Sequence, residues 1–184
     1  MQIEYTPEQT ALQPKLEAAN INPESFLATD YLNHYNEIVM LLEMIPDMPD
    51  MVEDAADWAP KSYAQHFQDS GFQDTNLAIE AFNLAPTPIK NAFTIVCNEI
   101  DILIQSTLAG LNALNAAERG LSGAASDLIR QRVKDAQGLL LKLNQVIHGK
   151  IEDESSFVGT LDIEEKPETV DDVQSQEDID KLFN

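Results

Sequence analysis

The residues best placed for chemistry in this sequence are two polar side chains four positions apart, Asp127 and Gln131. Side chains at that spacing share one face of a helix, and both lie away from the apolar stripe that includes Ile129. A carboxylate can pair with a cation on a docked protein, and an amide can orient a water molecule through hydrogen bonds. The pair therefore predicts either a catalytic site that acts on a bound partner or a solvated surface pair.

The end of the chain has a short amphipathic pattern suited to binding a partner. Ser175 can cap a helix, and acidic residues follow it in the first turn, where the helix dipole favours negative charge. Ile179, Leu182 and Phe183 lie at positions i, i+3 and i+4 and share one face. So short a helix is unstable alone, so we expect it to form only when its apolar face enters a groove of another protein.

The segment Ser175–Phe183 resembles the N-terminal peptide by which the flagellar motor switch protein captures the phosphorylated chemotaxis response regulator. The resemblance implies three apolar anchors and two polar contacts, which are Ile179, Leu182 and Phe183 with Asp178 and Asp180. Two features depart from that family: the peptide lies at the C-terminal end, and Lys181 replaces a residue that is often small. The alternative interpretation is an acidic tail that ends in an amphipathic turn by chance.

The overall plan is similar to that of the phosphatase that removes the phosphoryl group from the same response regulator. That family has a helical hairpin that dimerises, a flexible linker, a C-terminal regulator-binding helix and an Asp-Leu-x-x-Gln pattern. Asp127 and Gln131 match the pattern, whereas Ile129 and Arg130 replace the Thr-Gly of the family. The resemblance implies that Gln131 positions the attacking water at a magnesium-coordinated aspartyl phosphate, while Asp127 contacts a lysine of the regulator.

Three functional hypotheses follow. In the first, the chain is a non-catalytic adaptor or regulator in chemotaxis and flagellar motility that binds a phosphorylated receiver domain through its C-terminal peptide. In the second, it is an aspartyl-phosphate phosphatase that uses Gln131 and Asp127. In the third, it is a structural helical interaction protein without a signalling role.

The elements that must position these residues are helices. Apolar residues recur at spacings of three and four and are interrupted by proline and glycine, which predicts an all-α helical bundle with a long antiparallel helix hairpin. We expect a first helix over 7–19 and a second that is capped by Thr29 or Asp30 and stops at Pro46. The hairpin helices have apolar stripes, formed by Ile89, Phe93, Val96, Ile100, Leu103, Thr107, Leu111 and Leu114, and by Ile129, Val133, Ala136, Leu140, Leu143 and Ile147. Gly149 is placed to cap the second of them.

The region from Pro46 to Phe72 predicts short helices and turns folded over the bundle, because its prolines interrupt any long helix. It also contains aromatic residues, which include Trp58, Tyr63 and Phe67. Four methionines, Met40, Met44, Met48 and Met51, run into this region, and they fit either core packing or an adaptable docking surface.

Composition changes at the end of the bundle. We expect a helical domain over 1–150, a flexible acidic linker over 151–174 and a partner-binding peptide over 175–184. Residues 151–184 carry 12 acidic and 2 basic side chains and lack a helical apolar period. Such a segment buries too little apolar surface to offset its conformational entropy, so we expect an acidic, disordered tail.

Charge and composition exclude several classes of function. The net charge of −21 repels phosphate backbones and anionic membranes, so we expect no nucleic-acid partner and no membrane insertion. We recognise no secretory signal and therefore expect a cytoplasmic protein, and the resemblance to chemotaxis proteins implies a bacterial one. The hairpin allows a homodimer. His34, His66 and His148 are far apart in sequence, so we expect no metal and no other cofactor. The single cysteine, Cys97, lies among apolar residues and predicts a buried structural thiol.

Overall fold

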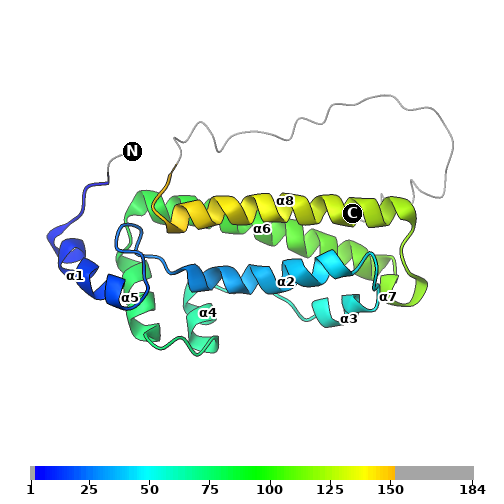
Figure 1. The fold of residues 1–184 in the computed structure, drawn as a ribbon, viewed down its shortest axis with the longest axis horizontal. Helices are drawn as coiled ribbons and strands as arrows, with labels where there is room; N and C mark the ends of the chain where they lie inside the picture. Colours follow the sequence, from blue (N-terminus) through cyan, green and yellow to red (C-terminus); the bar gives the residue numbers. More distant parts are fainter. Residues whose placement is uncertain (1–2, 152–184) are drawn as a thin grey trace, which may run out of the picture.

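The computed structural model describes residues 3–151, and these residues form helices joined by turns, with no strand among them (Figure 1). The all-α helical fold is therefore confirmed. The elements are α1 (Pro7–Ala18), η1 (Thr29–Tyr31), α2 (Leu32–Met44), α3 (Met51–Ala55), α4 (Tyr63–Asp69), α5 (Thr75–Leu84), α6 (Thr87–Ala113), α7 (Ala116–Arg119) and α8 (Gly123–Ile147). The expected linker over 151–174 and peptide over 175–184 lie, except for residue 151, outside the described residues.

Three long helices form the centre of the molecule. α6 and α8 make the most extensive packing contact, α2 packs against α8, and the short α7 lies in the connection between α6 and α8 (Figure 1). The apolar stripes of α6 and α8 face the core as expected, although Leu103 and Leu140 are only half-buried. Packing of these stripes against one another, rather than helix propensity, supplies most of the stability of the long helices.

Local signals define the ends of α8. At its start the Ser122 side chain accepts a hydrogen bond from the Ala125 backbone N–H at 3.2 Å. At its other end Gly149 has a φ of +75°, which favours glycine, as the sequence predicted. The Gly149 N–H donates to the carbonyl of Val146, and the Lys150 N–H donates to that of Gln145. This double hydrogen bond is the Schellman ending, and it stops the helix and redirects the chain.

The end of α8 is attached to the loop that follows α1. The Ser25 hydroxyl is fully buried and donates to the carbonyl of Ile147 in the last turn of α8. A Cβ added to Gly149 would lie 3.2 Å from a carboxylate oxygen of Glu24 in the same loop. The chain therefore leaves α8 at a point that is held by an otherwise distant part of the sequence.

The N-terminal helix packs on α5 at the end of the molecule that lies opposite α7 (Figure 1). Thr6 and Gln9 form a capping box, in which each side chain bonds the backbone of the other residue. The Gln9 amide also donates to the carbonyl of Leu84 at 2.8 Å, which ties α1 to the end of α5. α1 ends at Ala18, one residue before the expected end.

The start of α2 differs from the prediction. Neither Thr29 nor Asp30 caps α2, because the chain enters it through the 3₁₀ turn η1 and no side chain bonds its first N–H groups. The carboxylate of Asp30 instead lies 3.1 Å from the imidazole of His66. His66 is distant in the sequence, so the local pattern of capping residues could not reveal that Asp30 pairs with it.

Residues 46–72 fold over the bundle as short helices and turns, as expected, and α5, which follows them, was not predicted. Tyr31 is the centre of an aromatic layer and lies within 5.3 Å, centroid to centroid, of both Tyr63 and Phe93. Phe82 stacks on Tyr63 at 4.5 Å, and Phe67 is completely buried beside them. Burial of these large rings attaches α4 and α5 to η1 and α6.

α6 is long and apolar enough to cross a membrane by length and composition alone, with a mean hydropathy of 1.2 in its best window. It has no unbroken apolar run of that length, because Glu99 and Asp101 interrupt it. Central helices of globular cores pass the same test, and α6 contributes ten buried residues to this core.

Candidate functional site

The outer face of α8 contains the two residues proposed for catalysis. Asp127 and Gln131 lie one turn apart and are both exposed, while Ile129 and Val133 between and after them are buried. The Ser122 cap and the buried stripe fix the rotation of α8, so this polar face points away from the core. A docked protein could therefore reach both side chains.

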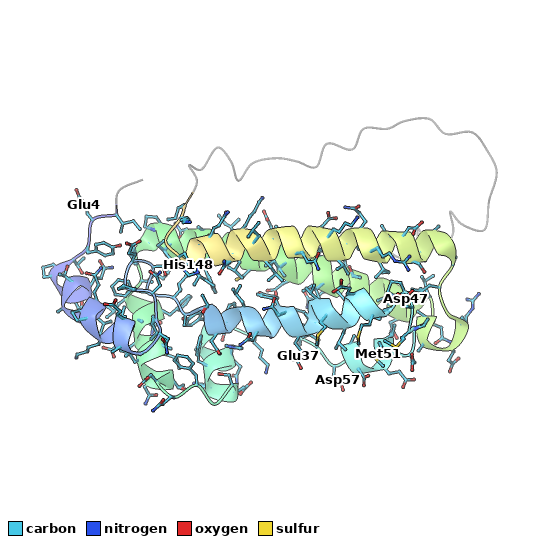
Figure 2. The ribbon with its side chains drawn as sticks, in the orientation of Figure 1. Glu4, Glu37, Asp47, Met51, Asp57 and His148 are labelled. Atoms are coloured by element: carbon cyan, nitrogen blue, oxygen red, sulfur yellow. The ribbon has the colours of Figure 1, made fainter. Side chains whose placement is uncertain are left out.

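Each of the two side chains has its own partner. The Gln131 amide donates to the carboxylate of Asp135 at 3.0 Å, on the same helix. Arg130 donates to Asp127 at 3.4 Å and to Asp47 at 3.3 Å, and Asp47 lies near the start of α8 (Figure 2). These bonds are solvent-exposed and worth little energy, so a partner can replace them when it docks. A free Gln131 amide can then both donate to and accept from a water molecule.

The charge of α8 sets it apart from the other helices. α8 carries four basic and two acidic side chains, whereas every other helix of residues 3–151 is neutral or net negative. The guanidinium of Arg132 is half-buried and donates to the hydroxyls of Ser106 at 2.9 Å and Thr107 at 3.2 Å on α6. Burial lowers the pKa of Arg132 from its usual value. Among these helices, α8 would therefore attract an acidic partner most strongly through its net positive charge.

The residues expected to bind a partner through the tail, Ser175, Asp178, Ile179, Asp180, Leu182 and Phe183, lie outside the described residues. Their role stays a prediction from the sequence.

Two histidines come together that the sequence separates by more than thirty positions. The ring centroids of His34 on α2 and His66 on α4 are 6.2 Å apart, and both side chains are buried. Trp58 stacks on the His34 ring at 5.0 Å and donates to the His34 carbonyl at 3.1 Å. His34 and His66 are far apart in the sequence but close in space, because α3 and α4 fold over α2.

The protonation of His34 is strongly biased by its surroundings. Its Nε2 accepts a hydrogen bond from the Lys61 backbone N–H at 3.1 Å, so a neutral ring carries its proton on Nδ1. Burial, followed by the nearby His66 and Lys61, lowers the pKa of His34 to about 4. A neutral imidazole is therefore built into the packing at neutral pH.

The histidine cluster borders an open hollow of about 360 Å³ that also contains Asp30, Glu37, Lys61 and Asp69. Among the described residues, no three His, Cys, Asp or Glu side chains are arranged to hold a metal ion. Lys61 pairs with Asp69 at 3.0 Å, and His66 faces Asp30. These two pairs join α4 to η1 and to the loop that precedes α4, which indicates a structural role.

Cys97 is buried, as expected, and lies near Tyr35 and Asp101. Burial raises the pKa of the Cys97 thiol to about 12, so it has little thiolate at neutral pH. Tyr35 donates to the Asp101 carboxylate at 2.9 Å, which joins α2 to α6. Burial raises the pKa of Asp101, and the Tyr35 hydrogen bond opposes that rise.

The methionines divide between core and surface. Met40 and Met48 are 56% and 43% exposed, whereas Met51 packs against the core. Core packing therefore accounts for only part of this set.

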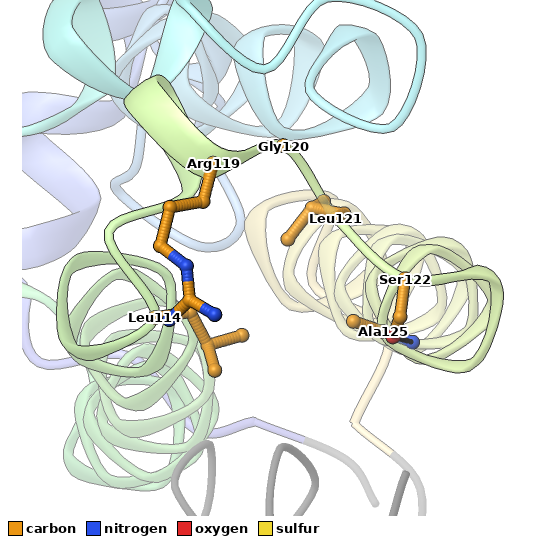
Figure 3. Close-up of a pocket in the computed structure, with 6 residues that line it drawn as sticks. All are labelled: Leu114, Arg119, Gly120, Leu121, Ser122 and Ala125. Atoms are coloured by element: carbon orange, nitrogen blue, oxygen red, sulfur yellow. Dashed lines mark hydrogen bonds between the residues drawn. The ribbon is translucent and has the colours of Figure 1, made fainter. Parts of the chain in front are cut away.

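A second, smaller hollow of about 170 Å³ lies where α7 joins α8 (Figure 3). Of the described residues that line it, Arg119 is the one charged residue, beside Leu114 and Leu121. It collects none of the residues predicted to act in catalysis.

Comparison with known proteins reveals no relative: no family model, no curated protein and no solved structure matches this chain.

Proposed function

We propose that this chain binds the phosphorylated receiver domain of a chemotaxis response regulator through its C-terminal peptide. The observation that carries the proposal is the pattern of Ser175–Phe183, in which acidic residues precede Ile179, Leu182 and Phe183 on one helical face. In this proposal residues 151–174 act as a flexible acidic linker. The linker keeps the peptide close to the bundle while the bundle holds another component or acts on the regulator.

A direct binding measurement tests this proposal. A fluorescently labelled peptide covering Val170–Asn184 is titrated with a chemotaxis response regulator, with and without a phosphoryl analogue, and its anisotropy is recorded. We expect micromolar binding that tightens when the regulator carries the analogue. Absence of binding in both states would show that the resemblance is accidental.

Alanine substitutions locate the binding energy. Ile179→Ala, Leu182→Ala and Phe183→Ala are each expected to weaken binding by about 1–3 kcal/mol, because each removes an apolar anchor from the groove. Lys181→Ala, on another face of the same turn, is the matched control and is expected to change affinity little. Equal losses at Lys181 and at the three anchors would contradict a helix docked by one face.

A second function, phosphatase activity, is favoured by one feature of α8. Asp127 and Gln131 share an exposed face, so a tethered regulator could bring its phosphoryl group against them. Hydrolysis needs a positioned water in line with the aspartyl phosphate, which already lies on its magnesium ion in the regulator. Gln131 would orient that water, and Asp127 would pair with a cation of the regulator. The tether would raise the local regulator concentration and compensate for weak contacts at α8.

We also propose a homodimer in which α6 and α8 form a long antiparallel hairpin. Ile95 and Ile102 on α6 are 45% and 68% exposed and lie two turns apart on one face. Exposed apolar residues at that spacing suit pairing with a helix of a second copy. Sedimentation equilibrium of the full chain tests this, and a monomer at every concentration would contradict it.

A further inference from the structure

The outer stripe of α8 is defined here as Gln131, Lys134, Gly138, Leu141 and Lys142. These residues recur at spacings of three and four, all are exposed, and Leu141 is 61% exposed. None of them is used in packing α8 against α2 or α6. The outer stripe thus combines positive charge with an apolar side chain on a surface that no described residue covers.

Two of its cations have no acidic partner among the described residues. Arg130 pairs with Asp127 and Asp47, but neither Lys134 nor Lys142 is within salt-bridge distance of a carboxylate in residues 3–151. Lys134 and Lys142 lack carboxylate partners although the described residues outside α8 carry 18 acidic and 5 basic side chains. An acidic segment would be attracted electrostatically to the outer stripe and repelled by the net negative surface of the other helices.

Gly138 leaves a gap in the middle of the outer stripe. A Cβ added there would meet no atom within 4 Å, so the core does not require a glycine. Glycine inside a helix is less favourable than alanine. What glycine provides is close access to the helix backbone, between Lys134 and Lys142.

The segment of this chain that follows α8 has complementary properties. Residues 152–184 carry 12 acidic and 2 basic side chains, together with the apolar Ile179, Leu182 and Phe183. A chain of about 30 residues without fixed structure spans on average about 30 Å. Lys134 lies about 20 Å from the end of α8, at 1.5 Å per residue. Residues 152–184 are therefore numerous enough to reach the outer stripe from the end of α8.

We propose that the acidic C-terminal segment, residues 152–184, folds back onto the outer stripe of α8 in the same molecule. Its carboxylates pair with Lys134 and Lys142, its apolar residues contact Leu141, and its backbone approaches at Gly138. Bound there, the segment covers Gln131 and buries the apolar face of its own peptide.

Paramagnetic relaxation in the full-length chain tests this contact. A nitroxide is attached to Asn184→Cys in the ¹⁵N-labelled protein, while the buried Cys97, with its raised pKa, stays unmodified. We expect amide signals on the outer stripe, from Lys134 to Lys142, to lose intensity selectively. The loss should disappear in the Lys134→Glu, Lys142→Glu variant and at high salt. The Lys15→Glu, Lys90→Glu variant makes the same change in net charge away from α8 and should keep it.

Three outcomes would overturn the proposal. One is intensity loss spread evenly over the helices, another is loss that persists when both lysines are reversed, and the third is loss centred on another helix. A mixture of ¹⁵N-labelled chains without nitroxide and unlabelled chains with nitroxide identifies contact between two copies, which also contradicts a contact within one molecule. No response regulator is present, so the result is independent of the anisotropy measurement that tests the proposed function.

Discussion

The Gln131→Ala variant is expected to lose dephosphorylation of the regulator, on the order of 10²-fold, while its affinity for the regulator is unchanged. Alanine removes the amide that would orient the attacking water, and it leaves α8 intact because Gln131 is exposed and its amide donates to Asp135 on its own helix. Alanine is also the strongest helix former, so stability should not fall. The measurement is phosphate release from the phosphorylated regulator in the presence of the full-length chain.

Gln137→Ala is the matched control for this experiment. Gln137 is another exposed glutamine of α8, but it lies outside the face shared by Asp127 and Gln131. It should leave phosphate release unchanged. If Gln131→Ala releases phosphate as fast as the unmodified chain, Gln131 has no catalytic role. If the unmodified chain does not accelerate release at all, the adaptor hypothesis is favoured over the phosphatase.

Acidification is expected to destabilise the fold through His34. The folded-state pKa of His34 is about 4, against an ordinary value of 6.5, because the charged ring is disfavoured by burial. Between pH 6.5 and 4, His34 is therefore protonated in the unfolded chain and neutral in the folded chain. The free energy of unfolding falls as pH decreases through this range. A folded-state pKa of about 4 against an ordinary 6.5 corresponds to about 3 kcal/mol of unfolding free energy lost over that range.

Replacing the histidine isolates this effect from the titration of the many carboxylates. His34→Gln keeps a group that can accept the Lys61 hydrogen bond but removes the titration, so its unfolding free energy should depend less on pH. His148→Gln, at the exposed end of α8, should keep the pH dependence of the unmodified chain. Urea unfolding followed by circular dichroism between pH 7 and 4 measures both. Identical pH dependence in His34→Gln and the unmodified chain would exclude His34 as the cause.

Helix positions were predictable where the sequence carries local signals. Pro46, just beyond the end of α2, and Gly149, just beyond the end of α8, mark helix ends that depend on nearby backbone groups alone. The buried stripes of α6 and α8 were likewise predictable from their spacing. The short α7 was not predicted. It follows Asn115, whose left-handed backbone conformation is not evident from the residue pattern.

The long-range features were not predictable in the same way. Asp30 was expected to cap α2, but it faces His66, which is 36 positions away in the sequence. The pairing of His34 with His66 and the stacking of Trp58 depend on how α3 and α4 fold over α2. Local periodicity contains no information about that path. For the candidate site, spacing correctly placed Asp127 and Gln131 on an exposed face, but it could not show that Arg130 and Asp135 bond them.

The attachment of Ser25 to the last turn of α8 has a mechanical consequence. Residues 152–184 begin just after this point, so any tension that a bound partner exerts on them reaches the bundle first at Gly149 and Ile147. The Ser25 hydrogen bond shares that load with the loop after α1, which is joined to the opposite terminus of the chain. A pull on this point would therefore act on a helix end that two parts of the chain hold, and unwinding the last turn of α8 would also break the Ser25 hydrogen bond.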